Sequence, residues 1–461
     1  MTVSNDEHPL VTEYRAWSPK SEQLSRRARK VFPGGDTRAS AHYGPYPLVM
    51  KKAEGCRLRD VDGHEVIDFM NNFTSLIHGH AHPAVVGAVS EQVALGSAYA
   101  APSLNQIELA ELIADRIPSV EQLRFCSSGS EATLMALRCA RAHTGRQKIM
   151  KMEGGYHGSY EQAEVSLVPY PDSRGALDHP ASLPVDKSIP DSVLADTVIC
   201  PYNEPELARA LIRENADELA AVIVEPVLGS MGMVAATTEF LQALRDETEK
   251  HGVVLIFDEV ITLRLSGGGT QAIHGISPDL TSMGKIIGGG LPVGAIGGKR
   301  ELLQIFSPET RENVFHASTF SGNALTMAAG FAAMSHFTDT EAKRLNWLGD
   351  KLREGFNLIL HQNGICGQAI GLGSLTNLHL TDENLHDSRD AMLGMVASGH
   401  ISRLLHLGML RRGIMSASRL MYCISTPMGE DEVVAAITAL NETLIELRPF
   451  IKEERPELLT M

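Results

Sequence analysis

The amino-acid sequence predicts an α/β fold with a mostly parallel sheet, followed by a smaller C-terminal domain. Continuous apolar runs at residues 220–224 and 253–257 are typical of strands that are buried on both faces. From about residue 104, helical patterns alternate with strands, as expected where helices cover both faces of a parallel sheet. After about residue 335 the pattern becomes rich in helix and then mixed, which indicates a second domain.

The N-terminal region differs from this alternating pattern. Residues 1–30 are polar and charged, and we expect them to form a surface arm or helix. Residues 58–61 and 64–67 are predicted to pair as a β-hairpin, with Asp62 and Gly63 supplying turn residues of positive φ.

The alternating region contains helices and strands with defined ends. Proline cannot continue a helix and glycine favours its C-terminal end, so Pro118, Gly145 and Gly252 mark three helix ends. The predicted elements are a helix at 104–117, a strand at 122–126, a helix at 131–143, strands at 148–152 and 220–224, a helix at 240–251 and a strand at 253–257.

Polar residues fall at the carboxyl ends of three of these strands. A Ser-Ser-Gly sequence at 127–129 follows one strand, and Glu225 and Asp258 follow the two apolar runs. In an open α/β sheet the ligand binds beyond the carboxyl ends of the strands. We therefore expect the functional site at this edge.

The composition argues against several classes of function. The chain has 461 residues and a formal net charge of −15, with 43% hydrophobic and 21% charged residues, a balance typical of a soluble globular protein. An acidic surface argues against nucleic acid and anionic membranes as partners. It does not exclude an anionic small substrate, because a local cationic pocket can lie on an acidic protein.

The cysteines and the N-terminus predict a cytoplasmic protein. The six cysteines are scattered without metal-ligand spacing, so we expect reduced, mostly buried thiols. Residues 1–9 lack the basic start and apolar stretch of a signal peptide. No apolar run reaches the roughly 18 residues of a membrane span.

The sequence Cys-Ser-Ser-Gly-Ser-Glu at 126–131 carries the first candidate site. A strand ends there, small hydroxyl residues and a glycine follow, and a helix begins. Free N–H groups at a helix start attract an anion and serine hydroxyls add donors, so the segment has the form of a phosphate cup. Plain helix capping by serine is the alternative, and the spacing alone favours it.

Asp258 and Lys285 are further candidates. A carboxylate at the end of a buried strand is well placed to accept a charged N–H from a ring, although it could simply cap the next turn. Lys285 lies beside Met283, Gly284 and Ile286, an apolar setting that lowers the pKa of an amine and makes it nucleophilic toward an aldehyde. These neighbours argue against the usual role of lysine as a solvated surface charge.

Several motifs occur together in a fixed order. They are Ser-Gly-Ser-Glu-Ala at 128–132, Gly-Tyr-His-Gly at 155–158, Glu-Pro at 225–226, Asp-Glu-Val at 258–260, Lys285 with the glycine-rich stretch after it, and Thr-Phe-Ser-Gly-Asn at 319–323. In this combination the chain resembles a fold-type I, class III aminotransferase from about residue 33 to residue 427.

The resemblance implies an architecture. It implies a large domain with a mostly parallel seven-stranded sheet and a smaller α+β C-terminal domain. We accordingly predict an N-terminal segment at 1–75 that packs with the small domain, a large cofactor-binding domain at 76–335 and a small domain at 336–461.

The resemblance also implies pyridoxal 5'-phosphate as cofactor, with Lys285 as the Schiff-base lysine and Lys285 and Asp258 as catalytic residues. Two departures, Ser127 for asparagine and Ser130 for threonine, keep hydrogen-bonding capacity. The implied cofactor contacts are Ser128, Gly129 and Ser130 to the phosphate, Tyr156 and Val260 to the ring faces, Glu225 near the phenolic oxygen, Asp258 to the ring nitrogen, His157 in the same site, and Ser318 and Thr319 to the phosphate of a neighbouring subunit. The active unit would then be a homodimer.

Arg38 and Arg419 are the candidates for substrate binding. The Pro-Gly-Gly sequence at 33–35 before Arg38 is similar to that of glutamate-1-semialdehyde aminomutases, and the closer likeness is to β-phenylalanine aminotransferases. Arg419 matches a small-domain arginine of that second branch. A guanidinium binds both oxygens of a carboxylate, so we predict that these residues bind the amino donor and the keto acid. Two surface arginines are the alternative.

We therefore predict a transaminase that moves an amino group from an amino acid, with β-amino acids favoured, to a keto acid such as 2-oxoglutarate or pyruvate. The alternatives are an aminomutase of the glutamate-1-semialdehyde type, an amino-acid racemase, or an aminotransferase acting on a diamino acid. The aminomutase interpretation expects an acidic residue in the small-domain site, and residues 414–421 contain none.

The closely spaced histidines His78, His80 and His82 could be interpreted as metal ligands. No cysteine or carboxylate joins them in the sequence, and such turns before a helix are a feature of the family that the chain resembles. We predict no metal site here.

Overall fold

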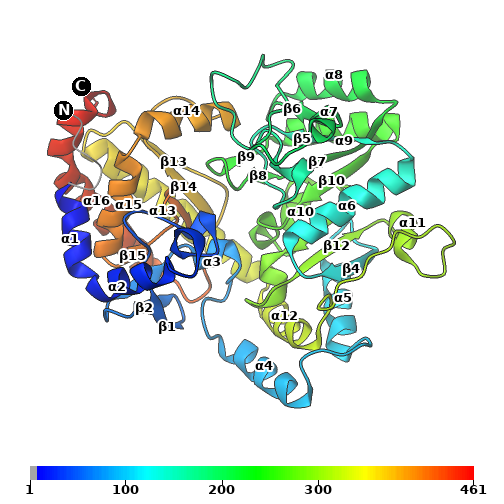
Figure 1. Cartoon of the computed structure of the whole chain (residues 1–461), viewed down its shortest axis with the longest axis horizontal. Helices are drawn as coiled ribbons and strands as arrows, with labels where there is room; N and C mark the ends of the chain where they lie inside the picture. The colour runs from blue at the N-terminus through cyan, green and yellow to red at the C-terminus, as the bar shows by residue number, and fades with distance from the viewer. Residues whose placement is uncertain (1–7, 461) are drawn as a thin grey trace.

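A seven-stranded sheet forms the centre of the larger half of the molecule (Figure 1). The computed structural model describes residues 8–460, so most of the N-terminal stretch that argues against a signal peptide lies outside the described residues. Across the sheet, the strands are β4 (Gln122–Cys126), β12 (Gly294–Gly298), β11 (Leu280–Gly284), β10 (Val254–Asp258), β7 (Leu219–Val224), β5 (Lys148–Met152) and β6 (Thr197–Cys200). β12 is antiparallel to its two neighbours and the other pairings are parallel, which confirms the predicted sheet.

Helices cover both faces of this sheet, as the continuous apolar runs predict. Alternate side chains of a strand point to opposite faces. Val222 and Val224 of β7 therefore join the apolar cluster of α8 and α9, while Ala221 and Ile223 join that of α6. The longer helices of this half are α4 (Pro83–Leu95), α5 (Leu104–Arg116), α6 (Gly129–Thr144), α8 (Pro205–Asn215), α9 (Thr238–His251) and α12 (Ala324–His336).

The predicted bounds of these elements agree with the structure to within two residues. β4 and β5 coincide with their predictions, and α6 starts two residues early, at Gly129. α6 is closed by Gly145 in the left-handed conformation, with a φ of 71°. β10 extends one residue further than predicted, so that Asp258 is the last residue of the strand.

The predicted hairpin forms, but its turn differs from the prediction. β2 (Arg57–Asp60) and β3 (Glu65–Asp68) pair antiparallel, and Gly63 has a positive φ of 104° whereas Asp62 does not. Asp62 instead accepts the backbone N–H groups of Lys20 and Ser21 at 2.7 and 2.9 Å. It thereby caps the start of α2 (Pro19–Ala28), which a side chain from another segment can do as well as a local one.

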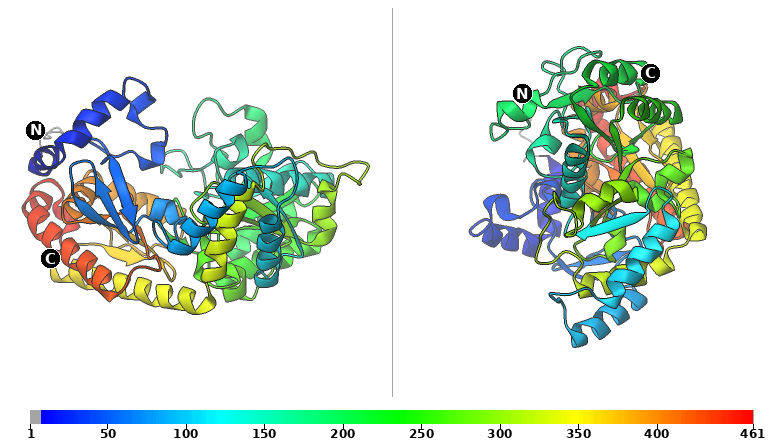
Figure 2. Two further views of the ribbon diagram at one scale, coloured as in Figure 1. Left: turned by 90° about the horizontal axis from the view of Figure 1, so that it is seen from below. Right: turned by 90° about the vertical axis from the view of Figure 1, so that its right-hand side faces the viewer.

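The smaller half combines the two ends of the chain (Figure 2). β15 (Ile414–Met415) pairs in parallel with β3 and extends the sheet that β1 (Met50–Glu54) begins. A second sheet has the order β13 (Gln368–Ile370), β14 (Leu375–His379) and β16 (Met421–Cys423). The helices here are α1 (Pro9–Trp17), α2, α13 (Asp339–Gln362), α14 (Ser388–Ser398), α15 (Ile401–Arg411) and α16 (Glu430–Glu454). The division of the chain at residues 75 and 335 stays our proposal.

Short elements complete the described chain. They are α3 (Asn71–Thr74), α7 (Asp191–Ala195), α10 (Gly269–His274), α11 (Arg300–Leu303), β8 (Val227–Leu228), β9 (Val234–Ala235) and the 3-10 turns η1 (Pro33–Gly35), η2 (Ala39–Ala41), η3 (Glu161–Glu164), η4 (Thr262–Leu265), η5 (Lys285–Gly288), η6 (Gln304–Phe306) and η7 (Pro456–Leu458). Cys366 is partly buried and the other cysteines are buried, which confirms the prediction of mostly buried thiols. Between residues 8 and 460, no helix has the length and apolar character that crossing a bilayer requires.

Candidate active site

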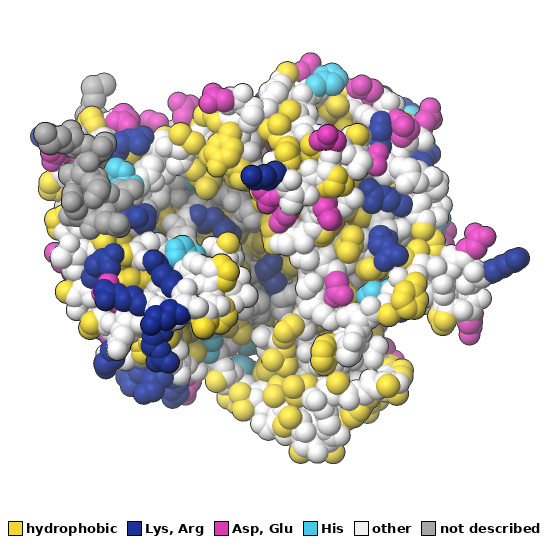
Figure 3. Space-filling view, in the orientation of Figure 1, with side chains coloured by type: hydrophobic (Ala, Val, Ile, Leu, Met, Phe, Trp, Pro, Cys, Tyr) yellow, Lys and Arg dark blue, Asp and Glu magenta, His cyan; other side chains and the backbone are white. Residues whose placement is uncertain are grey.

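A cavity of about 560 Å³ lies at the carboxyl ends of the strands, between the two halves of the molecule. Figure 3 shows the surface hollowed at this boundary. Ten predicted site residues line the cavity: Arg38, Ser128, Gly129, Ser130, Tyr156, His157, Glu225, Asp258, Val260 and Lys285. Of the other predicted residues, Ser318, Thr319 and Arg419 are not among those that line this cavity within residues 8–460.

The N-terminus of α6 forms one end of the cavity. Ser128 is its N-cap residue, and the hydroxyl oxygen accepts the N–H of Glu131 at 3.1 Å. The N–H groups of Gly129 and Ser130 lie in the first helical turn, where no carbonyl one turn back is available to them. These groups can bind an anion, aided by the positive end of the helix. Helix capping and anion binding are therefore compatible here, because the first uses a side chain and the second uses the backbone.

Two glycines allow other segments to approach this helix start closely. A Cβ on Gly294 would lie 1.9 Å from the carbonyl oxygen of Ser128. A Cβ on Gly158, whose φ is 115°, would lie 2.4 Å from the hydroxyl of Ser130. A larger residue at either position would displace the anion-binding backbone, so the packing here depends on the missing side chains.

Asp258 is held at the end of β10 by two hydrogen bonds. Its Oδ2 lies 2.8 Å from Nδ1 of His157, and its Oδ1 accepts the N–H of Val260 at 3.1 Å. Both Asp258 and His157 are buried. Burial lowers the pKa of His157, an effect that Asp258 opposes. The carboxylate is thus oriented and shielded from water, and it keeps lone pairs for a further N–H donor.

Lys285 follows β11 directly and lies in the cavity rather than on the solvated surface. Its φ of 48° is left-handed, a conformation that is uncommon for residues other than glycine and costs roughly 1–3 kcal/mol. Burial lowers the pKa of the amine, Asp258 and Glu225 oppose this shift, and Arg419 adds to it. A larger share of the amine is therefore uncharged, which is the form that reacts with an aldehyde.

Glu225 links two turns above the sheet. Its Oε2 accepts the N–H of Tyr156 at 2.8 Å, and its Oε1 accepts that of Gly229 at 3.1 Å. Burial and the neighbouring Asp258 raise the pKa of Glu225 to about 8. At neutral pH this carboxyl group therefore carries a proton for much of the time and can donate a hydrogen bond into the cavity.

Lys151 is a buried charge that the sequence analysis does not identify. It is 0% exposed in β5, and its Nζ donates to the carbonyl of Val165 at 2.6 Å. Burial lowers its pKa to about 7, against the opposing effects of Glu225 and Glu153. The available signal was a lysine between apolar residues inside the strand, three positions from its start.

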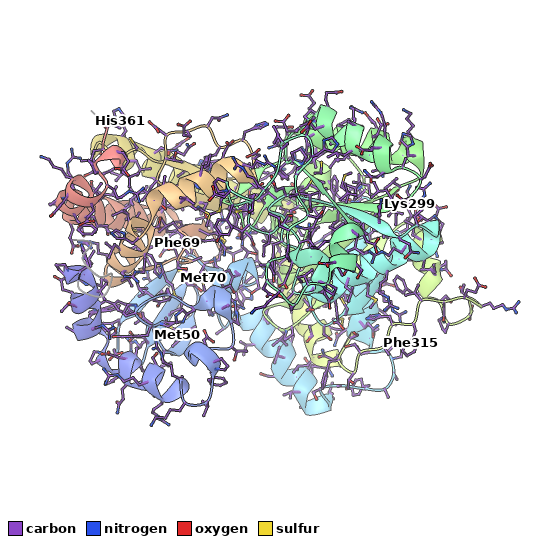
Figure 4. The ribbon with its side chains drawn as sticks, turned by 45° about the horizontal axis from the view of Figure 1, so that its top comes forward. Met50, Phe69, Met70, Lys299, Phe315 and His361 are labelled. Atoms are coloured by element: carbon purple, nitrogen blue, oxygen red, sulfur yellow. The ribbon has the colours of Figure 1, made fainter. Side chains whose placement is uncertain are left out.

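Two arginines lie against the ring of Phe73 near the cavity. The guanidinium carbons of Arg38 and Arg419 are 5.1 and 5.6 Å from the centre of that ring. Arg38 also donates to Oδ1 of Asn72 at 2.7 Å. Figure 4 marks Met70, next to this segment, at the boundary between the two halves. Arg38 is exposed, whereas Arg419 is partly buried and donates to the carbonyl of Gly229 at 3.2 Å.

Residues 71–74 carry Phe73 on a left-handed turn, which the sequence analysis also does not identify. All four have a positive φ, between 47° and 72°. Asparagine tolerates this conformation best among residues other than glycine, and Asn71 and Asn72 begin the turn. The Asn-Asn pair was the available signal. Backbone strain of this kind is concentrated at functional sites.

Other polar groups of the sequence analysis have structural partners. His80 Nε2 lies 2.8 Å from Oδ2 of Asp68, a carboxylate twelve positions earlier that the fold brings to the three histidines. His78 lies between Thr426 and the carbonyl of Ala333, at 3.1 and 2.9 Å. These contacts join the turn before α4 to the rest of the fold.

Ser318 and Thr319 lie on a long segment that follows η6. The Ser318 hydroxyl is 3.2 Å from that of Ser127 in the same chain. Phe315 and Phe320 on this segment are 76% and 61% exposed, and Figure 4 marks Phe315 near one end of the molecule. The assignment of Ser318 and Thr319 to the phosphate of a neighbouring subunit stays a prediction.

The fold and the cavity together define a class of protein. A mostly parallel sheet whose carboxyl ends carry a lysine, an aspartate and an anion-binding helix start is the arrangement of the fold-type I transferases that the sequence resembles. The chain belongs to the family described as Aminotransferase class-III, whose profile matches residues 39–428.

Relatives of this chain carry two kinds of name. A protein of Brevibacillus brevis named glutamate-1-semialdehyde 2,1-aminomutase 2 is 43% identical over 368 residues, which are 79% of this chain and 84% of the relative. An omega-transaminase from Sphaerobacter thermophilus has a structure with a TM-score of 0.88 and 43% identity, covering 93% of this chain and 98% of that one. The β-phenylalanine aminotransferase of Variovorax paradoxus has a TM-score of 0.86 and 34% identity, covering 98% of each chain.

We expect replacement of the buried lysine, Lys151→Met, to change how stability depends on pH. Between about pH 7 and the ordinary lysine pKa of 10.5, the unfolded chain binds a proton that folded Lys151 has lost. The stability of the wild type therefore rises with pH across this window, and methionine removes that contribution. The lost hydrogen bond to Val165 costs about 1 kcal/mol at every pH.

Urea unfolding of both proteins at pH 7, 8 and 9 measures this effect. The variant should be favoured most at pH 7, and its advantage should shrink as pH rises. Lys148→Met, at the start of the same strand, is the matched control. A difference between Lys151→Met and the wild type that is constant over this range would contradict the assignment.

Proposed function

We propose that this protein moves amino groups on small carboxylate-bearing substrates, with pyridoxal 5'-phosphate as its cofactor. The convergence of Lys285, Asp258 and the start of α6 in one cavity carries this proposal. The cavity therefore contains an amine that can react with an aldehyde, a carboxylate that can bind a protonated ring nitrogen and an anion site that can bind a phosphate.

The residues of the cavity fit this cofactor. The backbone amides of Gly129 and Ser130 would bind its phosphate, Tyr156 and Val260 would enclose its ring, and Asp258 would keep the ring nitrogen protonated. When bound, pyridoxal 5'-phosphate supplies an electron sink that stabilises negative charge on the substrate carbon beside the amino group.

Lys285 and Glu225 carry the protons in this proposal. Lys285 would hold the cofactor through Nζ, and its amine, when free and uncharged, would take the proton from the substrate carbon beside the amino group. The lowered pKa of Lys285 favours the uncharged amine that this step needs. Glu225, with a pKa of about 8, can donate a hydrogen bond into the same cavity.

The names of the relatives support an aminomutase better than the transaminase that our sequence analysis favours. The Brevibacillus brevis relative is named as a glutamate-1-semialdehyde 2,1-aminomutase. An enzyme of this kind moves an amino group within a single substrate and requires no external keto acid. The first candidate is therefore amino-group migration within one carboxylate-bearing substrate.

A transaminase is the second candidate, and the arginine pair favours it. Arg38 and Arg419 lie against one aromatic ring, and residues 414–421 contain no acidic side chain. Two guanidinium groups suit two carboxylates, one on an amino acid and one on a keto acid such as 2-oxoglutarate or pyruvate. Substrate tests separate the two candidates. Glutamate 1-semialdehyde is supplied alone, and α-, β- and diamino acids are supplied with and without keto acid. Turnover without keto acid supports the aminomutase.

The protein would act as a homodimer. Large apolar side chains are exposed on α4, on the segment before α5 and on α5 itself. Figure 3 shows this patch over α4. Exposed apolar patches of this kind mark protein–protein interfaces. Ser318 and Thr319 would then face the phosphate bound in the neighbouring subunit. The exposed residues are Val86, Val93, Leu95, Tyr99, Leu104 and Ile107.

We expect Lys285→Ala to retain cofactor through the phosphate and ring contacts but to lose turnover by at least about a thousandfold, because no other amine is positioned to carry the proton. Absorbance of the dialysed protein measures bound cofactor, and product formation measures turnover. Lys299→Ala, a lysine that pairs with Asp279 outside the cavity, is the control. Turnover near that of the wild type would remove Lys285 from this role.

We expect Arg38→Ala and Arg419→Ala each to lower kcat/KM for a carboxylate-bearing amine by about 10- to 100-fold. A hydrogen bond to a charged group contributes roughly 1.5–3 kcal/mol, which corresponds to that range. The matched substrates are 3-amino-3-phenylpropionate and 1-phenylethylamine, which lacks the carboxylate. An equal loss for both amines would argue against carboxylate binding by that arginine.

We expect light scattering to report a dimer for the wild type and a larger share of monomer for Leu104→Glu, because a charge in an apolar interface is poorly solvated. Leu358→Glu, an exposed leucine on α13, is the control and should stay dimeric. A wild type that is monomeric at micromolar concentration would end the homodimer proposal.

A further inference from the structure

Lys151 is a buried amine that the proposed reaction does not use. It lies inside β5 and is 0% exposed. It is not among the residues of the described chain that line the cavity containing Lys285. Lysine is almost never fully buried unless it is paired, because the ammonium group loses its hydration. The contacts of this amine therefore indicate its role.

Lys151 points to the same face of the central sheet as Asp258. Alternate residues of a strand point to opposite faces, and in β5 Ile149 packs toward α6 whereas Met152 packs toward α8 and α9. Lys151 therefore faces α6. The same alternation in β10, where Ile256 packs toward α6, directs Asp258 to this face. The amine thus lies on the side of the sheet where the start of α6 forms one end of the cavity.

The amine of Lys151 closes a loop that begins at the end of β5. Its Nζ donates to the carbonyl of Val165 at 2.6 Å. Nearby along the chain, the N–H of Gly154 donates to the carbonyl of Ser166 at 2.9 Å. These two bonds join the ends of residues 153–166, which we call the β5 loop. The bond from Gly154 uses only backbone atoms, whereas the bond to Val165 requires a long side chain with a donor at its end.

The β5 loop carries two residues that line the cavity, Tyr156 and His157. The N–H of Tyr156 donates to Oε2 of Glu225 at 2.8 Å, and Nδ1 of His157 lies 2.8 Å from Oδ2 of Asp258. Both side chains therefore depend on the place of the loop above the sheet. Separation of the loop ends would move them relative to the ring and to Asp258.

The charge of Lys151 acts on the same groups. Burial lowers the pKa of Lys151, and the charges of Glu225 and Glu153 oppose this shift. Burial also lowers the pKa of His157, Asp258 opposes that shift and Lys151 adds to it. A neutral imidazole has one N–H group, and Nδ1 carries it here because a carboxylate only accepts hydrogen bonds. Asp258 then keeps its full negative charge for a ring nitrogen.

We propose that Lys151 is a positioning residue for the cofactor, because its amine closes the β5 loop and thereby holds Tyr156 at the ring and His157 at Asp258. Lys151 does not touch the cofactor and acts only through this loop. The role rests on the proposed function, since the ring that these residues position is that of pyridoxal 5'-phosphate. The closure of the loop does not rest on it.

Hydrogen exchange of the full chain, followed by mass spectrometry, tests the closure of the loop without any cofactor. We expect Lys151→Met to raise the exchange rate in peptides that cover residues 153–166 at least fivefold, because a charged hydrogen bond at the base of the loop is lost. Peptides from α9 should be unchanged. Lys148→Met, at the start of the same strand, is the matched control and should exchange as the wild type does. Wild-type exchange of the β5 loop in Lys151→Met would contradict the proposal.

Affinity of the apoprotein for pyridoxamine 5'-phosphate tests the positioning. This probe cannot form a bond to Lys285, so its affinity reports the other contacts of the site. We expect Lys151→Met and His157→Ala each to weaken binding at least tenfold. The double variant should bind as weakly as the weaker single variant, because Lys151 acts through the loop that holds His157.

Three outcomes of the affinity measurement decide between the proposals. Wild-type affinity of Lys151→Met, or losses that multiply in the double variant, would remove the positioning role and leave the proposed function intact. Multiplied losses are the result expected if Lys151 only supports the strand. A wild type that does not bind the probe would remove the proposed function and this role with it. Lys151→Leu, which also lacks a donor, replaces Lys151→Met if circular dichroism shows that the methionine variant is unfolded.

Discussion

The burial of charged groups beneath the cavity constrains the rest of the structure. Lys285 and Lys151 are amines in a buried setting, and Asp258, Glu225 and Glu153 are the acidic groups that favour their charged forms. An isolated buried charge is strongly unfavourable, so each group is tolerable only while the others stay in place. The same balance keeps the Lys285 amine reactive and leaves Glu225 able to exchange a proton near neutral pH. The reactivity of Lys285 and the stability of the buried groups around it therefore depend on the same distances between these side chains.

The sequence predicts the sheet and the site at its edge because both follow from local rules. Continuous apolar runs such as that of β7 require cover on both faces, and parallel strands place their carboxyl ends at one edge. Residues distant in sequence, such as Ser128, Glu225 and Asp258, then lie close together without any further information. Lys285 could be recognised as unusual because its apolar neighbours are adjacent to it in the chain.

The features that the sequence analysis misses depend on contacts between distant segments. Asp62 looks like a turn residue, yet its carboxylate caps α2, some forty residues earlier. No local pattern indicates that the ring of Phe73 contacts both Arg38 and Arg419, because these contacts are set by the left-handed turn and by the position of the C-terminal strands. Lys151 was visible as a lysine inside a strand, but only one of its two acidic neighbours, Glu153, is close in sequence, whereas Glu225 follows β7.

The parallel pairing of β3 with β15 also bears on how the protein is made. Ile67 and Ile414, which are partners in this pairing, are separated by about 350 residues. During synthesis the N-terminal strands emerge long before β15, so this edge of β3 is unpaired until residues 414–415 have been made. An unpaired strand edge is open to pairing with other chains. The seven-stranded sheet, whose strands all lie between residues 122 and 298, can meanwhile form without the C-terminus. The order of synthesis therefore allows the central sheet to form before β3 gains β15, and the unpaired edge of β3 is exposed in that interval.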